Sequence, residues 1–238
     1  MNKKQWLIFI AIMLFLTFTL FIQNSIYTLL LLIFMLLQYV VNLNAKRIKN
    51  NSFKNADWVR RTLYFIPYLS AVLFLLPNEK DIFPSINIVL SIVLSVIAGF
   101  FFIYLRKEEI KPFYNKELII FFPPVTKKQK WIESYSLIFS AIFQELFYKL
   151  FVLTILIPIY GSILSILISA FLFVSDHIIH DKAQAFRTID HILQFSLSVL
   201  GGCLYILSGN VVTAVIIHLI YNLSISISYF YRYKFSNA

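Results

Sequence analysis

Long uninterrupted runs of apolar residues dominate this chain, and short polar stretches separate them. A helix that crosses the hydrocarbon core of a bilayer, roughly 30 Å thick, needs about 20 apolar residues, and these runs approach that length. They are apolar on all faces instead of alternating, so they predict helices and not the strands of an outer-membrane barrel. The predicted spans are Trp6 to Ile22, Ile26 to Leu43, Thr62 to Leu76, Ile86 to Leu105, Tyr135 to Tyr160, Ser162 to His177, Ile192 to Leu207 and Val211 to Tyr229.

The composition agrees with a membrane protein. Hydrophobic residues make up 60% of the 238 residues and charged residues only 13%, which is far outside the range of a soluble domain. The predicted fold class is therefore all-α, a polytopic membrane helix bundle with about eight transmembrane helices. The first run follows Lys3 and Lys4, as a secretory signal would, but it is long and no small-residue cleavage site follows it, so we predict a retained helix.

Basic residues orient the predicted bundle. If the N-terminus is cytoplasmic, every Lys and Arg lies in a cytoplasmic segment except Lys80, in the outer loop NEKDIFPS, and Lys149, inside a span. The positive-inside rule then predicts that both termini are cytoplasmic, in a multi-pass protein of a plasma membrane, and the residue bias is compatible with a bacterium. Orientation and attraction to anionic membrane lipids account for the net charge of +10, so no nucleic-acid partner is expected.

The two halves of the chain differ in polarity. Residues 1–131 are predicted to form membrane scaffold helices and an interfacial segment at ELIIFFPP. Polar groups at membrane depth gather after residue 135, so residues 132–229 are predicted to form the functional core and residues 230–238 a cytoplasmic tail. Ionisable groups at that depth cost roughly 2.5 to 3.5 kcal/mol each on insertion scales and usually mark functional sites.

Spacing by four residues places these polar groups in pairs on single helix faces. Three helices are therefore predicted to direct polar side chains into the bundle. For the first pair we expect a buried ion pair, with Glu145 as a base being the alternative. The pairs are Glu145 with Lys149, Phe173 with His177, and His218 with Asn222.

The order of QELFYK, ISAFLFVSDH and FSLSVLGGCLYILSGNVVTAVIIHLIYN resembles the CPBP family of intramembrane CAAX prenyl proteases and bacteriocin-processing or immunity proteins. The resemblance covers roughly residues 132 to 225. The family motifs are EExxxR, FxxxH, and HxxxN or HxxxD. The second and third motifs are filled by the residue pairs that start at Phe173 and His218. In the first motif only Glu145 is kept, because Gln144 replaces the leading glutamate and Lys149 replaces the arginine.

The resemblance implies hydrolysis of a peptide or membrane protein by a water that the leading glutamate activates with His177. It implies that His218 and Asn222 stabilise the oxyanion, and it implies no metal and no other cofactor. A carboxamide cannot accept the proton of that water, so Gln144 damages the mechanism at its first step. The residues predicted for catalysis are Gln144, Glu145, His177, His218 and Asn222, with Lys149 and Phe173 as structural support.

Two classes of function stay open from the sequence: an intramembrane endopeptidase, and a non-catalytic relative that binds a membrane partner as a regulator or immunity protein. Glu-to-Gln is also the usual exchange for disabling a catalytic acid, so an engineered position 144 is a further alternative. His218 and Asn222 could instead join helices by a hydrogen bond. We expect Asp176 to be solvated at the membrane edge, and Cys203 to be a small core residue.

Overall fold

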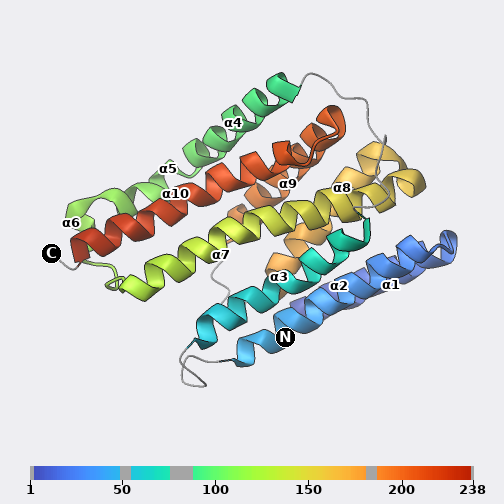
Figure 1. The fold of residues 1–238 in the computed structure, drawn as a ribbon, viewed down its shortest axis with the longest axis horizontal. Helices are drawn as coiled ribbons and strands as arrows, with labels where there is room; N and C mark the ends of the chain where they lie inside the picture. Colours follow the sequence, from blue (N-terminus) through green and yellow to red (C-terminus); the bar gives the residue numbers. More distant parts are fainter. Residues whose placement is uncertain (1–2, 49–54, 76–87, 181–186, 237–238) are drawn as a thin grey trace.

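The computed structural model describes residues 3–48, 55–75, 88–180 and 187–236, and within these ranges all regular structure is helical (Figure 1). The all-α prediction is therefore confirmed. Short segments link the long helices: η1 (Ala45–Arg47), α5 (Lys107–Ile110), η2 (Lys111–Tyr114), α6 (Lys116–Ile119) and the π-helical η3 (Leu146–Leu153). The long helices are α1 (Lys3–Ile22), α2 (Ile26–Asn44), α3 (Ala56–Leu75), α4 (Ile88–Leu105), α7 (Lys127–Glu145), α8 (Thr154–His180), α9 (Thr188–Ser208) and α10 (Val212–Ser236).

In the described part of the chain, six helical segments are long and apolar enough to cross a membrane, which makes this a multi-pass membrane protein. One of them, Lys127–Ile179, has 53 residues and contains two predicted spans. Gly161 separates the two spans, because its φ of 74° lies in a region that favours glycine and the chain folds back there. The six segments are Lys3–Ile22, Ile26–Asn44, Ile88–Leu105, Lys127–Ile179, Thr188–Ser208 and Val212–Phe235.

Helix α3 corresponds to the third predicted span but is not among the six. Arg60 and Arg61 lower its mean hydropathy, and it begins at Ala56, six residues before the predicted Thr62. The predicted end of this span, Leu76, and the loop that contains Lys80 lie outside the described residues.

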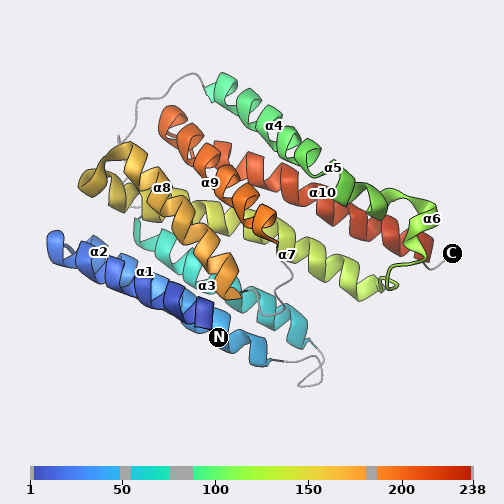
Figure 2. The ribbon, with the colours of Figure 1, turned by 180° about the vertical axis from the view of Figure 1, so that it is seen from behind.

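The helices form layers that are visible from both sides (Figures 1 and 2). Helix α4 lies at one edge, followed by α9 and α10, then α7 and α8, then α3, with α1 and α2 at the other edge. The start of α1 and the end of α10 lie at the same end of the bundle as the short helices α5 and α6, opposite the turn at Gly161 (Figure 1). This arrangement places both chain ends on one side of the membrane, and the choice of the cytoplasmic side stays a prediction from charge.

Two kinds of packing hold the layers together. A cluster of buried apolar side chains from α1, α2, α3, η3 and α8 includes Met35, Tyr39 and Phe151, which are fully buried. The backbones of α4 and α10 approach closely at Gly99. A Cβ added there would lie only 2.8 Å from the Cβ of Ile220. Small residues allow such approaches between membrane helices, where there is no hydrophobic driving force to bring them together.

The segment ELIIFFPP is too short to span and forms only part of α6 and the bend after it. Ile120 and Phe121 are 75% and 78% exposed there, next to the basic start of α7. Its place at the membrane interface stays a prediction.

Candidate functional site

A cavity of about 300 Å³ opens among the helices of both halves of the chain. Gln144, His177, His218 and Asn222 all line it, and Phe173 forms part of its wall. Helices α7, α8 and α10 therefore bring these residues together from positions up to 78 apart in numbering. Glu145 is not in the wall of the cavity, because it points into the protein and is only 1% exposed.

The first half of the chain contributes more to this cavity than the sequence predicted. Gln38 and Asn42 from α2 and Tyr68 from α3 line it, and both amide side chains are buried. The expectation that membrane-embedded polar groups gather only after residue 135 was therefore wrong. Gln38 and Asn42 are spaced by four in an apolar run, which is the same signal that singled out the later pairs.

Glu145 holds His218 from behind the cavity wall. The Oε1 atom of Glu145 lies 2.8 Å from Nδ1 of His218, across 73 residues of sequence, while its Oε2 atom is buried without a hydrogen-bond partner. A carboxylate accepts hydrogen bonds, so it favours the imidazole form with a proton on Nδ1. Nε2 is therefore the nitrogen of His218 that remains to interact with a molecule in the cavity.

The predicted ion pair between Glu145 and Lys149 was wrong. The Nζ atom of Lys149 donates a hydrogen bond of 2.6 Å to Oγ of Ser198 on α9, and the carboxylate of Glu145 contacts Nδ1 of His218 instead. Both side chains pass Gly201, where a Cβ would lie 3.6 Å from Oε2 of Glu145 and 3.6 Å from Cε of Lys149. The close approach of α9 at this glycine gives Lys149 a different partner from the one that its spacing predicted.

His177 is oriented by its own helix. Its Nδ1 atom lies 2.9 Å from the carbonyl oxygen of Phe173, which can only accept a hydrogen bond, so the proton sits on Nδ1 and Nε2 carries the lone pair. The ring of Phe173 lies between the two histidines, with its centroid 4.5 Å from that of His177 and 5.8 Å from that of His218. The predicted support residue Phe173 therefore contacts both imidazoles.

Asn222 and Gln144 differ in how their amides are used. The Nδ2 atom of Asn222 donates to the carbonyl oxygen of Leu137 at 2.8 Å and lies 3.5 Å from Oγ of Ser140. Its hydrogens therefore bind α7, as in the predicted interhelical hydrogen bond, and not the interior of the cavity. Gln144 lies beside the hydroxyl of Tyr68 at the cavity wall.

Asp176 is not at a solvated membrane edge, as the sequence had suggested, but 3% exposed inside the bundle. The Nδ2 atom of Asn42 donates to its Oδ1, and the hydroxyl of Tyr68 donates to its Oδ2. Because these donors come from α2 and α3, the carboxylate joins α8 to two helices of the first half. It also lines the cavity beside His177.

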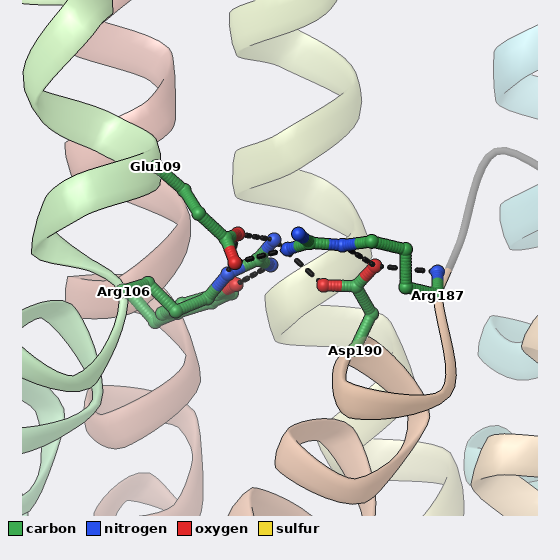
Figure 3. A network of polar contacts seen from close by, with 5 residues as sticks. Arg106, Glu109, Arg187 and Asp190 are labelled. Atoms are coloured by element: carbon green, nitrogen blue, oxygen red, sulfur yellow. Dashed lines mark hydrogen bonds and ion pairs between the residues drawn. The ribbon is translucent and has the colours of Figure 1, made fainter.

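Arg106, which lines the cavity, also belongs to a network of charged side chains that joins the start of α5 to the start of α9; Figure 3 shows this network. Arg106 pairs with Asp190 at 2.7 Å, bonds to Glu109 and donates to the hydroxyl of Tyr221 at 2.6 Å. Arg187 also bonds to Glu109. Burial alone would raise the pKa of Glu109, but hydrogen bonds and charges from Arg106 and Arg187 outweigh it and lower that pKa.

Within the described ranges, no group of three or more His, Cys, Asp and Glu side chains is placed to hold a metal ion. The side chain of His180, which is three residues from His177, is not among the described ones.

Residues 129–224 match a family model described as type II CAAX prenyl endopeptidase, Rce1-like. The match starts in α7 and ends in α10, and it confirms the resemblance to the CPBP family over the segment that holds Gln144, His177, His218 and Asn222. No curated protein and no solved structure matches the chain.

Proposed function

We propose that this protein is an intramembrane endopeptidase of the CAAX prenyl endopeptidase type, which hydrolyses a peptide bond inside the cavity. The observation that supports the proposal is that Gln144, His177, His218 and Asn222 line one cavity within the segment that matches the family model. Polar groups of this kind at membrane depth are costly, and catalysis gives a reason for several of them to converge.

The proposed substrate is a membrane-associated peptide. The family description names prenylated CAAX sequences, in which a lipid chain would hold the peptide at the membrane. The cavity has aromatic walls, with Tyr64, Phe65 and Phe173 among them, beside its polar residues. Such a wall suits apolar peptide side chains, while a few polar groups fix the position of the scissile bond.

The expected turnover is slow because of position 144. Hydrolysis needs a base to deprotonate water, and general-base help of this kind contributes roughly a hundred- to ten-thousand-fold. The carboxamide of Gln144 can hold a water but cannot take its proton. A carboxylate at this position should therefore raise the rate about a hundred-fold or more.

A second candidate is a partner-binding protein that retains the cavity without hydrolysis. Two observations favour it: the carboxamide at Gln144, and the amide of Asn222, which donates to the carbonyl oxygen of Leu137. In this case a peptide would occupy the cavity and remain intact.

Cleavage of a farnesylated CAAX peptide by purified protein in liposomes tests the proposal, with mass spectrometry of the products. We expect slow cleavage by the unaltered chain, a rise of about a hundred-fold for Gln144→Glu, and loss of that gain when His177→Ala is added. His191→Ala is the matched control, since His191 does not line the cavity. A Gln144→Glu protein that crosslinks to the peptide but never cleaves it would favour the partner-binding protein.

A further inference from the structure

We propose that Glu145 and His218 together form the general base of this chain, with His218 taking the proton from water and Glu145 acting as its positioning residue. This inference rests on the proposed function and names the group that replaces the missing carboxylate at position 144. It also assigns His218 a role other than the oxyanion donor that the family resemblance implied.

Geometry supports His218 as the base. Its Nδ1 lies 2.8 Å from a carboxylate oxygen of Glu145, and its ring lines the cavity, so Nε2 is the nitrogen that can reach a bound water. The carboxylate keeps the Nδ1–H tautomer, orients the ring, and compensates the positive charge that forms when Nε2 takes a proton. A buried carboxylate behind an imidazole does the same in Ser-His-Asp enzymes.

His177 has no such direct contact at Nδ1 with a carboxylate of the described residues. Its Nδ1 is bound to the carbonyl oxygen of Phe173, which carries no formal charge. The neighbouring Asp176 directs its two oxygens to Asn42 and Tyr68. A carboxylate in direct contact with the ring stabilises an imidazolium in the membrane interior most strongly, so the structure favours His218 over His177 as the proton acceptor.

The contacts of Glu145 also agree with a residue that acts on the reaction by positioning His218. Its Oε1 contacts Nδ1 of His218, and its Oε2 is buried without a hydrogen-bond partner. A carboxylate that only braced the bundle would be expected to use both oxygens, as Asp176 does. Lys149 lies beside the same glycine, Gly201, but its Nζ donates to Ser198 and forms no ion pair with Glu145.

The reaction balances with these groups alone. Nε2 of His218 takes one proton of a water, and the oxygen of that water forms a bond to the carbonyl carbon of the peptide. An N–H of Gln144, whose side chain lies beside the hydroxyl of Tyr68, can donate to the oxyanion, while the amide of Asn222 donates to Leu137. The proton on Nε2 then moves to the leaving nitrogen as the C–N bond breaks, which yields an acid and an amine and restores His218.

The assignment is tested by asking whether a carboxylate at position 144 makes the enzyme less dependent on the carboxylate at position 145. Glu145→Gln keeps the shape and an acceptor oxygen for Nδ1–H but removes the charge. We expect it to lower kcat for the farnesylated peptide about a hundred-fold, with KM and the melting temperature nearly unchanged. In the Gln144→Glu background the same change should cost less than about ten-fold, because the new carboxylate is an independent base.

The control is Ser198→Ala. This change removes the buried hydrogen bond between Lys149 and Ser198, which lies near Glu145 but does not involve His218. We expect it to have the same effect in both backgrounds. If Glu145→Gln also costs the same factor in both backgrounds, Glu145 is structural and the proposal is wrong. If the unaltered chain cleaves nothing while the Gln144→Glu protein is active, the proposal is also wrong, but the proposed function stands.

If neither the unaltered chain nor the Gln144→Glu protein cleaves the peptide, the proposed function fails. Nitrogen NMR of labelled histidine then tests separately whether Glu145 positions His218 as proposed. The proposal requires a proton on Nδ1 of His218, none on Nε2, and a shifted Nδ1–H resonance in Glu145→Gln. A His218 with its only proton on Nε2 would refute it.

Discussion

Glu145 and Asp176 are both carboxylates inside the bundle, 1% and 3% exposed, yet their partners give them different capacities. Asp176 accepts hydrogen bonds on both oxygens from an amide and a phenol, Asn42 and Tyr68, so it joins α8 to α2 and α3. Glu145 contacts an imidazole whose second nitrogen is left for the cavity. Equal burial therefore supports a fixed crosslink in one case and proton transfer in the other, and the partner makes the difference.

The largest expected effect on stability comes from Asp176→Ala. The change leaves the amide of Asn42 and the hydroxyl of Tyr68 without this acceptor, at about 1–3 kcal/mol for each buried group. We expect the free energy of unfolding in detergent, followed by circular dichroism, to fall by about 3 kcal/mol. Asp176→Asn keeps one acceptor oxygen and should lose about half as much; equal losses for the two variants would contradict the crosslink.

Glu145→Ala should cost less, about 2 kcal/mol, because it leaves one donor, Nδ1 of His218, without its acceptor. Lys149→Ala removes the contact with Ser198. A contacting buried ion pair would lose about 3–5 kcal/mol on removal of either member and show strong coupling between the two changes. The separate partners instead predict a coupling energy below about 1 kcal/mol in a double-mutant cycle measured by chemical unfolding.

Gly201→Ala tests the comparison because the added methyl group would contact Glu145, whereas Asp176 is not among its nearest neighbours. Its Cβ would lie 3.3 Å from the Cβ of Ala214 and 3.6 Å from Oε2 of Glu145. We expect a loss of about 1 kcal/mol in stability and a several-fold fall in peptide cleavage. Gly202→Ala, which meets Ile166 at 3.2 Å, is the control that should lower stability without the fall in cleavage.

The smallest effect is expected at Glu109, a carboxylate at the exposed end of the bundle. Arg106 and Arg187 hold its pKa below the ordinary value of 4.5, so its ion pairs add stability at neutral pH, and this stability is lost as the pH falls through the lowered pKa. The melting temperature of Glu109→Gln should be slightly below that of the unaltered chain at pH 7, and the difference should disappear as the pH falls through the lowered pKa of Glu109. A constant difference from pH 7 to pH 3 would contradict this pH dependence.

Hydrophobic runs were sufficient to predict the helices, because in a bilayer each span must satisfy its own backbone hydrogen bonds. Even the break between the spans that end at Tyr160 and begin at Ser162 agrees with the turn at Gly161. The start of α3 was missed because charged residues there, Asp57 and Arg60, form an ion pair within the helix instead of ending it.

The partners inside the bundle were less predictable. Spacing by four identifies a helix face but not the helix opposite it, so Lys149 was assigned to Glu145 and not to Ser198. Asp176 was placed near water because the predicted span ended at His177, whereas α8 continues to His180. Both errors concern contacts between distant segments, on which local periodicity carries no information.

The π-helical segment η3, directly after Glu145, affects how the site responds to a change in chain length. A π-helix holds extra residues in each turn compared with an α-helix, so the deletion of one residue between Leu146 and Leu153 can be absorbed when the segment rewinds as an ordinary helix. The same deletion in an α-helical turn would rotate Gln144 and Glu145 by about 100° relative to the helix that follows. These eight residues are therefore a place where the chain can lose one residue while the site keeps most of its orientation.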